Sequence, residues 1–185
     1  MPLIPFADID RLNDEAKTAF DRLPVKLNIM RMLANAETCF APFLRFGGSL
    51  LVKAQLDSAL REIIILQVVH IEGGEYEWVQ HVPIALGCGV TQAQIDAIAA
   101  GKYDAGCFSV GERAVMNLAA EVVEKVRASE ETLRKASEFL SPREIVELIL
   151  TIGNYMMVAR LTETTRVEID GPAGSKMLDA LRRQP

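Results

Sequence analysis

Residues 57–89 read DSALREIIILQVVHIEGGEYEWVQHVPIALGCG, and this stretch decides the fold. Asp57 and Ser58 provide a helix cap before a strongly apolar segment that we expect to be helical from Ala59 to about Ile71. The Gly73-Gly74 pair then breaks that helix. A second helix is predicted from Glu75 to about Leu86, ended by Gly87-Cys88-Gly89, where a glycine can adopt the left-handed cap conformation. The stretch therefore predicts two antiparallel helices joined by a glycine turn.

The rest of the chain shows the same helical period and no hairpin signal, which predicts an all-α fold. Three pairs of residues have the spacing of a capping box, in which Ser or Thr precedes Glu or Gln by three residues. These pairs are Thr91/Gln94, Ser109/Glu112 and Ser141/Glu144. We predict a single helical domain over residues 1–170 and a C-terminal tail over 171–185 that contains a short helix. Further helices are expected at 13–24, 28–34, 40–52, 129–140, 141–159 and 176–182.

Composition excludes several classes of function. The chain has 185 residues, 24% of them charged, and a formal net charge of -5. Without a basic run, this charge gives no footprint for nucleic acid or an anionic membrane surface. The start lacks the pattern of a signal peptide, and the longest uncharged apolar run, Ile63–Val69, is too short to cross a bilayer. We expect a cytoplasmic protein with no membrane or nucleic-acid partner.

The candidate chemical groups cluster in the same 57–89 stretch. Glu62 lies within a very apolar helix, where an unpaired charge is expensive to bury. Glu77 and His81 are four residues apart, so their side chains share one helix face. Contact between Glu62 and His81 would need crossed helices, a displaced loop or a bridging water. Pro83 removes a backbone donor and predicts a kink just after His81.

Each of these residues also has a structural interpretation. Glu62 can pair with a lysine or arginine, His81 can be a core histidine with satisfied nitrogens, and Glu77 can be a solvated charge. His70 is interpreted as structural, because nothing near it in the sequence completes a catalytic pair. Two histidines and no C-x-x-C motif give no metal site.

Three segments of the sequence together resemble the carboxymuconolactone decarboxylase family, which also contains the alkylhydroperoxidase D-like proteins. The first is REIIIL at 61–66, and the second is YEWVQHVPIA at 76–85 followed by GVT at 89–91. The third is EIVEL at 144–148 followed by IGNYMMVAR at 152–160. The resemblance extends over about residues 10–170. It implies an all-helical fold and a homo-oligomer, commonly a trimer or hexamer.

The resemblance also separates two branches of the family. The peroxidase branch has a cysteine pair where this sequence has Gly74 and Glu77, and its activity needs one thiolate to attack the peroxide and a second thiol to resolve it. Gly74 and Glu77 can do neither. The sequence looks more like the decarboxylase branch, in which an acid lies four residues before the histidine. The implied function is cofactor-free acid–base chemistry, decarboxylation or proton transfer, on a small carboxylated lactone or a related intermediate of aromatic degradation.

In this interpretation His81 transfers the proton, because a free imidazole has a pKa of about 6.5. Glu62 or Glu77 would orient the imidazole. No metal or cofactor is required, because the conjugated carbonyl of the substrate accepts the electrons. The predicted substrate contacts include two arginines that can hold a carboxylate and three aromatic residues, of which Tyr76 and Trp78 can equally be packing residues. These five are Arg61, Tyr76, Trp78, Tyr155 and Arg160.

Two other classes of function stay open. A thiol peroxidase could act through Cys88, seven residues after His81, although no resolving cysteine lies near it in the sequence. The structural interpretation of Cys39, Cys88 and Cys107 is that each is a small buried apolar residue. A non-catalytic protein that keeps the fold is the second alternative. Fast-reacting thiols in the native protein would favour the first, and a bell-shaped pH–rate profile would exclude the second.

Overall fold

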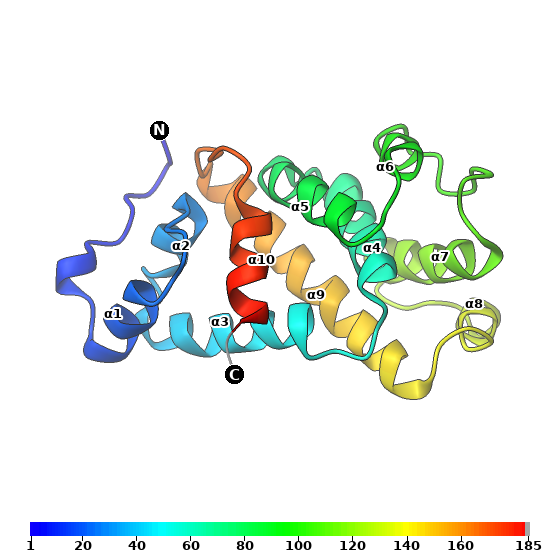
Figure 1. Ribbon diagram of the computed structural model, residues 1–185, viewed down its shortest axis with the longest axis horizontal. Helices are drawn as coiled ribbons and strands as arrows, with labels where there is room; N and C mark the ends of the chain where they lie inside the picture. Colours follow the sequence, from blue (N-terminus) through cyan, green and yellow to red (C-terminus); the bar gives the residue numbers. More distant parts are fainter. Residues whose placement is uncertain (184–185) are drawn as a thin grey trace.

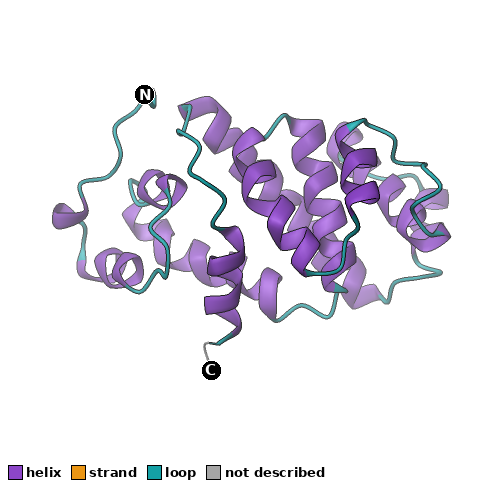
Figure 2. Cartoon of the chain, turned by 45° about the horizontal axis from the view of Figure 1, so that its top comes forward, coloured by secondary structure: helices purple, strands orange, loops and turns teal. Residues whose placement is uncertain are grey.

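The computed structural model describes residues 1–183, apart from the side chain of Leu181. Within this range the chain is all-helical and has no strand, as the sequence predicts (Figure 2). After a short 3₁₀ helix at Ile9–Arg11, the helices are α1 (Asp14–Asp21), α2 (Asn28–Leu33), α3 (Glu37–Val52), α4 (Ser58–Glu72), α5 (Glu75–Gly87), α6 (Gln92–Ala99), α7 (Val110–Lys125), α8 (Glu130–Ala136), α9 (Pro142–Thr165) and α10 (Gly174–Arg182).

The centre of the molecule is α4, which is buried continuously from Arg61 to Val69. Helices α5 and α9 lie beside it, and α6 and α7 cover another part of its surface (Figure 1). Figure 1 also shows α1, α2 and α3 at one end of the molecule and α6, α7 and α8 at the other, with α10 crossing in front of α3. A helix that is apolar on all sides must be covered in this way. The predicted pair of antiparallel helices is therefore the core of the fold.

The turn between α4 and α5 contains two glycines, each required for a different structural reason. Gly73 has φ 73°, in the left-handed region that favours glycine, and ends α4. Gly74 has an ordinary φ, but a Cβ there would lie 2.8 Å from Glu77 Oε2 and 3.0 Å from Ala159 Cβ. The first glycine is needed for its backbone conformation, and the second because no side chain fits.

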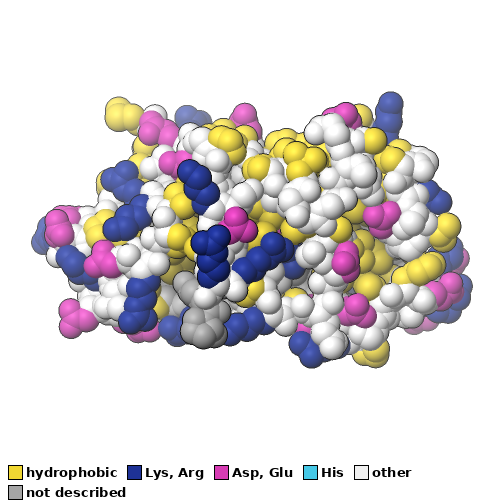
Figure 3. Space-filling view, in the orientation of Figure 1, with side chains coloured by type: hydrophobic (Ala, Val, Ile, Leu, Met, Phe, Trp, Pro, Cys, Tyr) yellow, Lys and Arg dark blue, Asp and Glu magenta, His cyan; other side chains and the backbone are white. Residues whose placement is uncertain are grey.

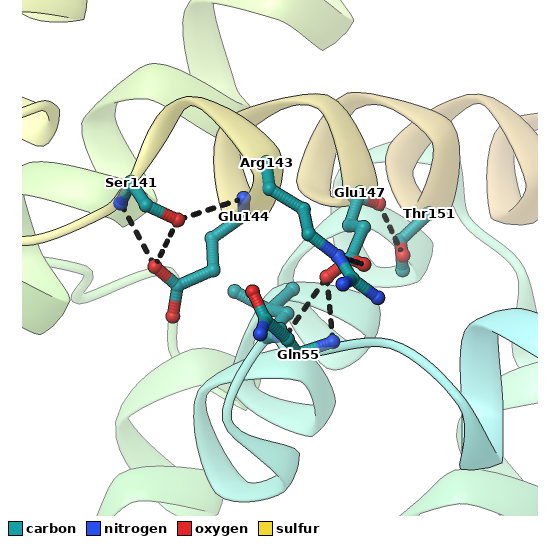
Figure 4. A network of polar contacts seen from close by, with 7 residues as sticks. Gln55, Ser141, Arg143, Glu144, Glu147 and Thr151 are labelled. Atoms are coloured by element: carbon teal, nitrogen blue, oxygen red, sulfur yellow. Dashed lines mark hydrogen bonds and ion pairs between the residues drawn. The ribbon is translucent and has the colours of Figure 1, made fainter.

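The three predicted capping boxes are all present, at Thr91/Gln94, Ser109/Glu112 and Ser141/Glu144. Figure 4 shows the last of these and, one turn further along α9, the carboxylate of Glu147. Glu147 accepts hydrogen bonds from the backbone N–H groups of Gln55 and Leu56, at 2.8 and 3.0 Å. This contact fixes the start of α4 against α9.

Some predicted boundaries are wrong. Helix α3 begins at Glu37, three residues before the expected start, and continues through Pro42. Helix α2 begins at Asn28 as expected, and the backbone N–H of Asn28 donates to Asp170 Oδ2 at 2.7 Å. Helix α8 ends at Ala136 rather than near Leu140. Helix α5 agrees with the prediction to within one residue, because it contains Pro83 and ends at Gly87.

The segment predicted as a tail packs against the domain. Helix α10 starts at Gly174, two residues earlier than expected, and contacts α5 and α3. The side chain of Gln80 binds the segment that precedes α10. It donates to the carbonyls of Asp170 and Gly171 and accepts from the backbone N–H of Ala173. A Cβ at Gly174 would collide with the Gln80 carbonyl, so α10 can approach α5 this closely only with glycine there.

Among the described helices, α9 alone is long and apolar enough to cross a membrane by length and composition. The core helix of a soluble protein meets the same criterion, and α9 contains nine buried residues that pack within the domain. The cytoplasmic location stays a prediction.

Candidate active site

A buried ion-pair network joins α4 and α5. Nδ1 of His81 donates to Oε2 of Glu62 at 2.8 Å, and the guanidinium of Arg61 donates to Oε1 of Glu62 at 3.2 Å through both Nε and Nη2. Glu62 has no exposed surface, and Arg61 and His81 retain 3% and 7%. The Arg61 charge offsets part of the cost of burying the Glu62 carboxylate. Glu62 and His81 thus meet directly, without the bridging water that the sequence left open.

This contact determines which nitrogen of His81 is available. Because Nδ1 donates to a carboxylate, the neutral ring carries its lone pair on Nε2. Nε2 makes no hydrogen bond with any other residue in the described part of the chain. A carboxylate–imidazole pair with one nitrogen free is an arrangement that suits a general acid or base.

Tyr155 from α9 completes this cluster. Its ring meets the His81 ring edge-on, with 4.8 Å between the centroids. Burial, and next the negative charge of Glu62, raise the pKa of Tyr155 well above its ordinary value. The phenol therefore stays protonated and can donate a hydrogen bond.

Glu77 does not hydrogen bond to His81, although the two side chains lie four residues apart on α5. Its carboxylate instead accepts from Oγ1 of Thr162 on α9, at 3.1 and 3.2 Å, and lies over Gly74. Burial raises the pKa of Glu77, although the Thr162 hydrogen bond and the neighbouring His81 act in the opposite direction. Glu77 is near the cluster, but Glu62 is the acid that holds His81.

A cavity of about 170 Å³ lies beside His81, between α5 and α9 on one side and α2, α3 and α10 on the other. Most of its lining is apolar. The side chains that line it and carry a polar group are Tyr76, Glu77, Gln80, His81, Asn154 and Tyr155.

Three of these six polar side chains are occupied by protein partners. Tyr76 donates to Asp170 at 2.5 Å, Glu77 is bound by Thr162, and Gln80 is bound to the segment that precedes α10.

The other three retain free polar atoms, namely Nε2 of His81, the hydroxyl of Tyr155 and the side-chain amide of Asn154. None of these groups makes a hydrogen bond to another described residue, and Oδ1 of Asn154 is fully buried. Buried polar groups in proteins are nearly always paired, so this arrangement points to a ligand or water in the cavity.

Sequence reasoning missed Asn154 as a site residue. The signal was a single amide among the apolar residues Ile152 and Tyr155 in the third resembling segment. Gln67 is the other described side chain with an unpaired buried oxygen, but it does not line this cavity, and its Nε2 donates to the carbonyl of Met116.

Several predicted site residues lie elsewhere. Arg61 does not line the cavity and is bound to Glu62, and Arg160 lies on the surface, where it donates to Glu72 at 3.1 Å. Trp78 does not line the cavity either; it packs against the main core cluster, with its ring 6.2 Å from that of His70. His70 is exposed, and its Nδ1 is 2.6 Å from the Tyr103 hydroxyl.

The three cysteines do not line the cavity either. The expectation that they are buried is wrong: Cys39 and Cys107 are exposed, and Cys88 is half-buried just after the end of α5. No group of three histidine, cysteine or acidic side chains among the described residues could hold a metal ion.

The fold and the site together define an all-helical protein whose central helix pair presents a buried glutamate–histidine pair to a small apolar cavity. Residues 38–121 match the model of the carboxymuconolactone decarboxylase family. The match covers α3 to α7 and includes Glu62, Glu77 and His81, and it confirms the resemblance seen in the sequence.

Solved structures share this fold. A protein from Ralstonia eutropha JMP134, described as an alkylhydroperoxidase AhpD core and an uncharacterized peroxidase-related protein, is 16% identical with a TM-score of 0.79, over 100% of this chain and 98% of that one. An uncharacterized peroxidase-related protein from Silicibacter sp. TM1040 is 18% identical with a TM-score of 0.78, over 98% and 96%. A protein of unknown function from Agrobacterium tumefaciens is 18% identical with a TM-score of 0.67, over 74% and 94%.

Identities this low show a common fold alone. Comparison with curated proteins gives no significant match.

Proposed function

We propose that the protein is an enzyme that uses His81 for cofactor-free proton transfer on a small molecule bound in the cavity. The observation that carries this proposal is the arrangement around His81: Glu62 holds Nδ1, and Nε2 lies free beside a cavity where Tyr155 and Asn154 also have unpaired polar groups. The family of residues 38–121 supports it.

The reaction that suits these groups is decarboxylation or isomerisation of a conjugated carbonyl compound. In the decarboxylation, the carbon–carboxylate bond breaks, CO₂ leaves, and the electron pair enters the conjugated carbonyl to form a dienolate. The protonated His81 then donates its Nε2 proton to carbon and regains one from water. Glu62 offsets the positive charge of the ring, and the Tyr155 hydroxyl can donate to the enolate oxygen.

The position of the basic residues bears on the carboxylated lactone as substrate. No lysine or arginine lines the cavity among the described residues. A carboxylate that the product retains therefore has to lie outside the apolar cavity, at its opening, whereas the carboxylate that leaves as CO₂ is attached to the reacting carbon beside His81.

An antioxidant activity through Cys88 is the second candidate, because two of the structures with this fold are described as peroxidase-related. Against it, Cys88 does not line the cavity, and the positions of the C-x-x-C motif hold Gly74 and Glu77. The Glu77 carboxylate also fills the space that a side chain at position 74 would need.

One experiment separates the two candidates. The wild-type protein and a variant with all three cysteines changed to serine are assayed for CO₂ release from a panel of unsaturated lactone acids and for loss of alkyl hydroperoxide. We expect acid turnover within a few-fold in both proteins and no catalytic loss of peroxide. Peroxide consumption that disappears in a folded Cys88→Ser variant would favour the thiol mechanism.

We also propose that a second copy of the chain covers an exposed face of α9. Four apolar side chains on this helix, at helical spacing, are 43–56% exposed: Val146, Ile149, Leu150 and Met157. Such a continuous apolar stripe is unusual on a monomer. We expect a trimer or hexamer by sedimentation, and dissociation in an Ile149→Lys, Met157→Lys variant. A 20 kDa species of the wild type at micromolar concentration would contradict this.

A further inference from the structure

A second hollow of about 600 Å³ lies between the end of α1, one side of α3 and the end of α10. Thirteen described residues line it. Four are basic and none is acidic, although the whole chain has 20 basic residues among 185 and a net charge of -5. We call this hollow the cationic groove, and its basic residues are Arg22, Arg45, Lys53 and Arg182. Figure 3 shows Lys and Arg side chains gathered over the region of α3 and α10.

The positive charge of the groove is barely neutralised within the described chain. Arg45 is 3.5 Å from Glu15, in a pair whose side chains are more than 60% exposed, and such pairs contribute little. Arg22, Lys53 and Arg182 form no ion pair with another described residue. Basic side chains that converge in this way repel one another and favour a bound anion.

The cationic groove and the cavity beside His81 are adjoining spaces. The same four residues line both: Leu23, Leu44, Gly48 and Met177. A molecule bound in the groove can therefore extend past these side chains toward the cavity.

The Gly47-Gly48 pair on α3 supports this path. Glycine inside a helix costs about 1 kcal/mol relative to alanine, so two in succession need a compensating reason. Both line the cavity, and a Cβ at Gly47 would meet no atom within 4 Å. The helix could accept a side chain there, and its absence keeps the cavity open.

We propose that the protein binds an elongated amphipathic organic anion. Its acidic head group, a carboxylate or a phosphate, lies in the cationic groove, and its apolar body enters the cavity to reach His81. The size of the cavity limits that body, because a cavity of about 150 Å³ accommodates a single benzene ring. The inference rests on the proposed function only in making His81 the reacting group; the binding itself is independent of turnover.

The test is calorimetric binding of matched probes. Each probe has a phenyl ring and an alkyl chain of two to six carbons that ends in a carboxylate, a phosphate or a neutral hydroxyl. We expect one chain length to bind best, and the acids to bind roughly 10-fold more tightly than the matched alcohol, with a difference that shrinks as salt is added. The ratio of the affinities for the carboxylate probe and the phosphate probe identifies the preferred head group.

Two variants test the two halves of the site. Arg22→Gln combined with Lys53→Gln should weaken the acids roughly 3- to 10-fold and leave the alcohol unchanged. Arg127→Gln, an exposed position in the turn between α7 and α8 at the opposite end of the molecule, is the matched control and should change neither (Figure 1). Gly47→Leu should fill the cavity and weaken every probe; Gly47→Met repeats the test if the leucine variant does not fold.

Equal binding of acid and alcohol, or no binding of any probe, would overturn the proposal. Acid binding that is insensitive to Gly47→Leu in a folded protein would also overturn it, because the ring would then lie outside the cavity. The two proposals fail separately. Loss of probe binding with retained turnover removes the anion site, whereas tight probe binding with no turnover of any acid removes the proposed function.

Discussion

The two histidines lie in different halves of the molecule, and their imidazoles differ in burial and in hydrogen-bond partner. His81, in the half formed around the cavity, is 7% exposed, and its Nδ1 is bound by the carboxylate of Glu62. His70, at the end of α4 in the half formed with α6, α7 and α8, is exposed and bound to the phenol of Tyr103. A buried negative charge can stabilise an imidazolium and orient its ring, whereas a phenol at the surface only positions the ring.

Glycines show a similar contrast. Gly47 on the cavity wall has open space around it, and Gly74 beneath Glu77 has none. The cavity half therefore contains both a preserved hollow and a position packed to its limit. Residue type alone therefore does not identify a site. The partner of the side chain and the space around it do.

The largest expected effect comes from His81. If this residue transfers the proton, His81→Ala should reduce turnover by roughly 10²- to 10⁴-fold with the fold retained. His81→Gln should lose as much, because an amide can hydrogen bond but cannot exchange a proton at neutral pH. The rate is followed by CO₂ release or by the loss of absorbance of an unsaturated lactone acid.

His70→Gln is the matched control in the other half. It should leave turnover unchanged and alter only stability, through the lost contact with Tyr103. Turnover of His81→Ala at the wild-type rate would remove the difference between the two histidines.

Glu62 should give the next largest effect, measured on stability. Glu62→Gln leaves the buried Arg61 without a negative partner, and breaking a buried pair in this way costs roughly 3–5 kcal/mol. Glu138→Gln breaks a surface pair with Arg134, whose 2.8 Å distance is shorter than the 3.2 Å between Arg61 and Glu62, and should cost less than about 1 kcal/mol. Urea unfolding measures both. Similar losses in the two variants would show that burial adds nothing to the Glu62 pair.

The sequence was sufficient for the fold and for part of the site. Caps, glycine breaks and helical period are local signals, and they predicted the helices and the 57–89 core pair. Glu62 was identified because a charge within an apolar helix is costly unless it is paired. The sequence left the contact between Glu62 and His81 open, because the crossing of two helices is set by tertiary packing. Asn154 and the cationic groove combine side chains from distant helices, so no local pattern could indicate them.

The third prediction concerns space in the cavity half. Gly74→Ala places a methyl group 3.0 Å from Ala159 Cβ and should destabilise the protein by about 1–3 kcal/mol. Gly87, at the other end of α5, is exposed, and a Cβ there would meet no atom within 4 Å. Gly87→Ala should be neutral or stabilise by up to about 1 kcal/mol. Thermal unfolding of the two variants shows whether each substitution lowers or raises the stability. A Gly74→Ala variant as stable as wild type would mean that the turn relaxes at little cost.

The smallest effect is the pH dependence contributed by Glu77. Its pKa is raised in the folded protein, first by burial, so the folded state keeps the proton over a pH range in which the unfolded state has lost it. The stability that this bound proton provides is complete below the ordinary pKa of 4.5 and is lost as pH rises through the folded pKa. Glu77→Gln has no such loss, so its stability relative to wild type should increase as pH rises above 4.5 and level off once pH has passed the folded pKa of Glu77. Thr162→Val removes a hydrogen bond that lowers the Glu77 pKa, and should therefore extend the loss to higher pH. Urea midpoints across this range measure the difference, and a flat or falling curve for Glu77→Gln would show that the buried carboxylate is compensated by its neighbours.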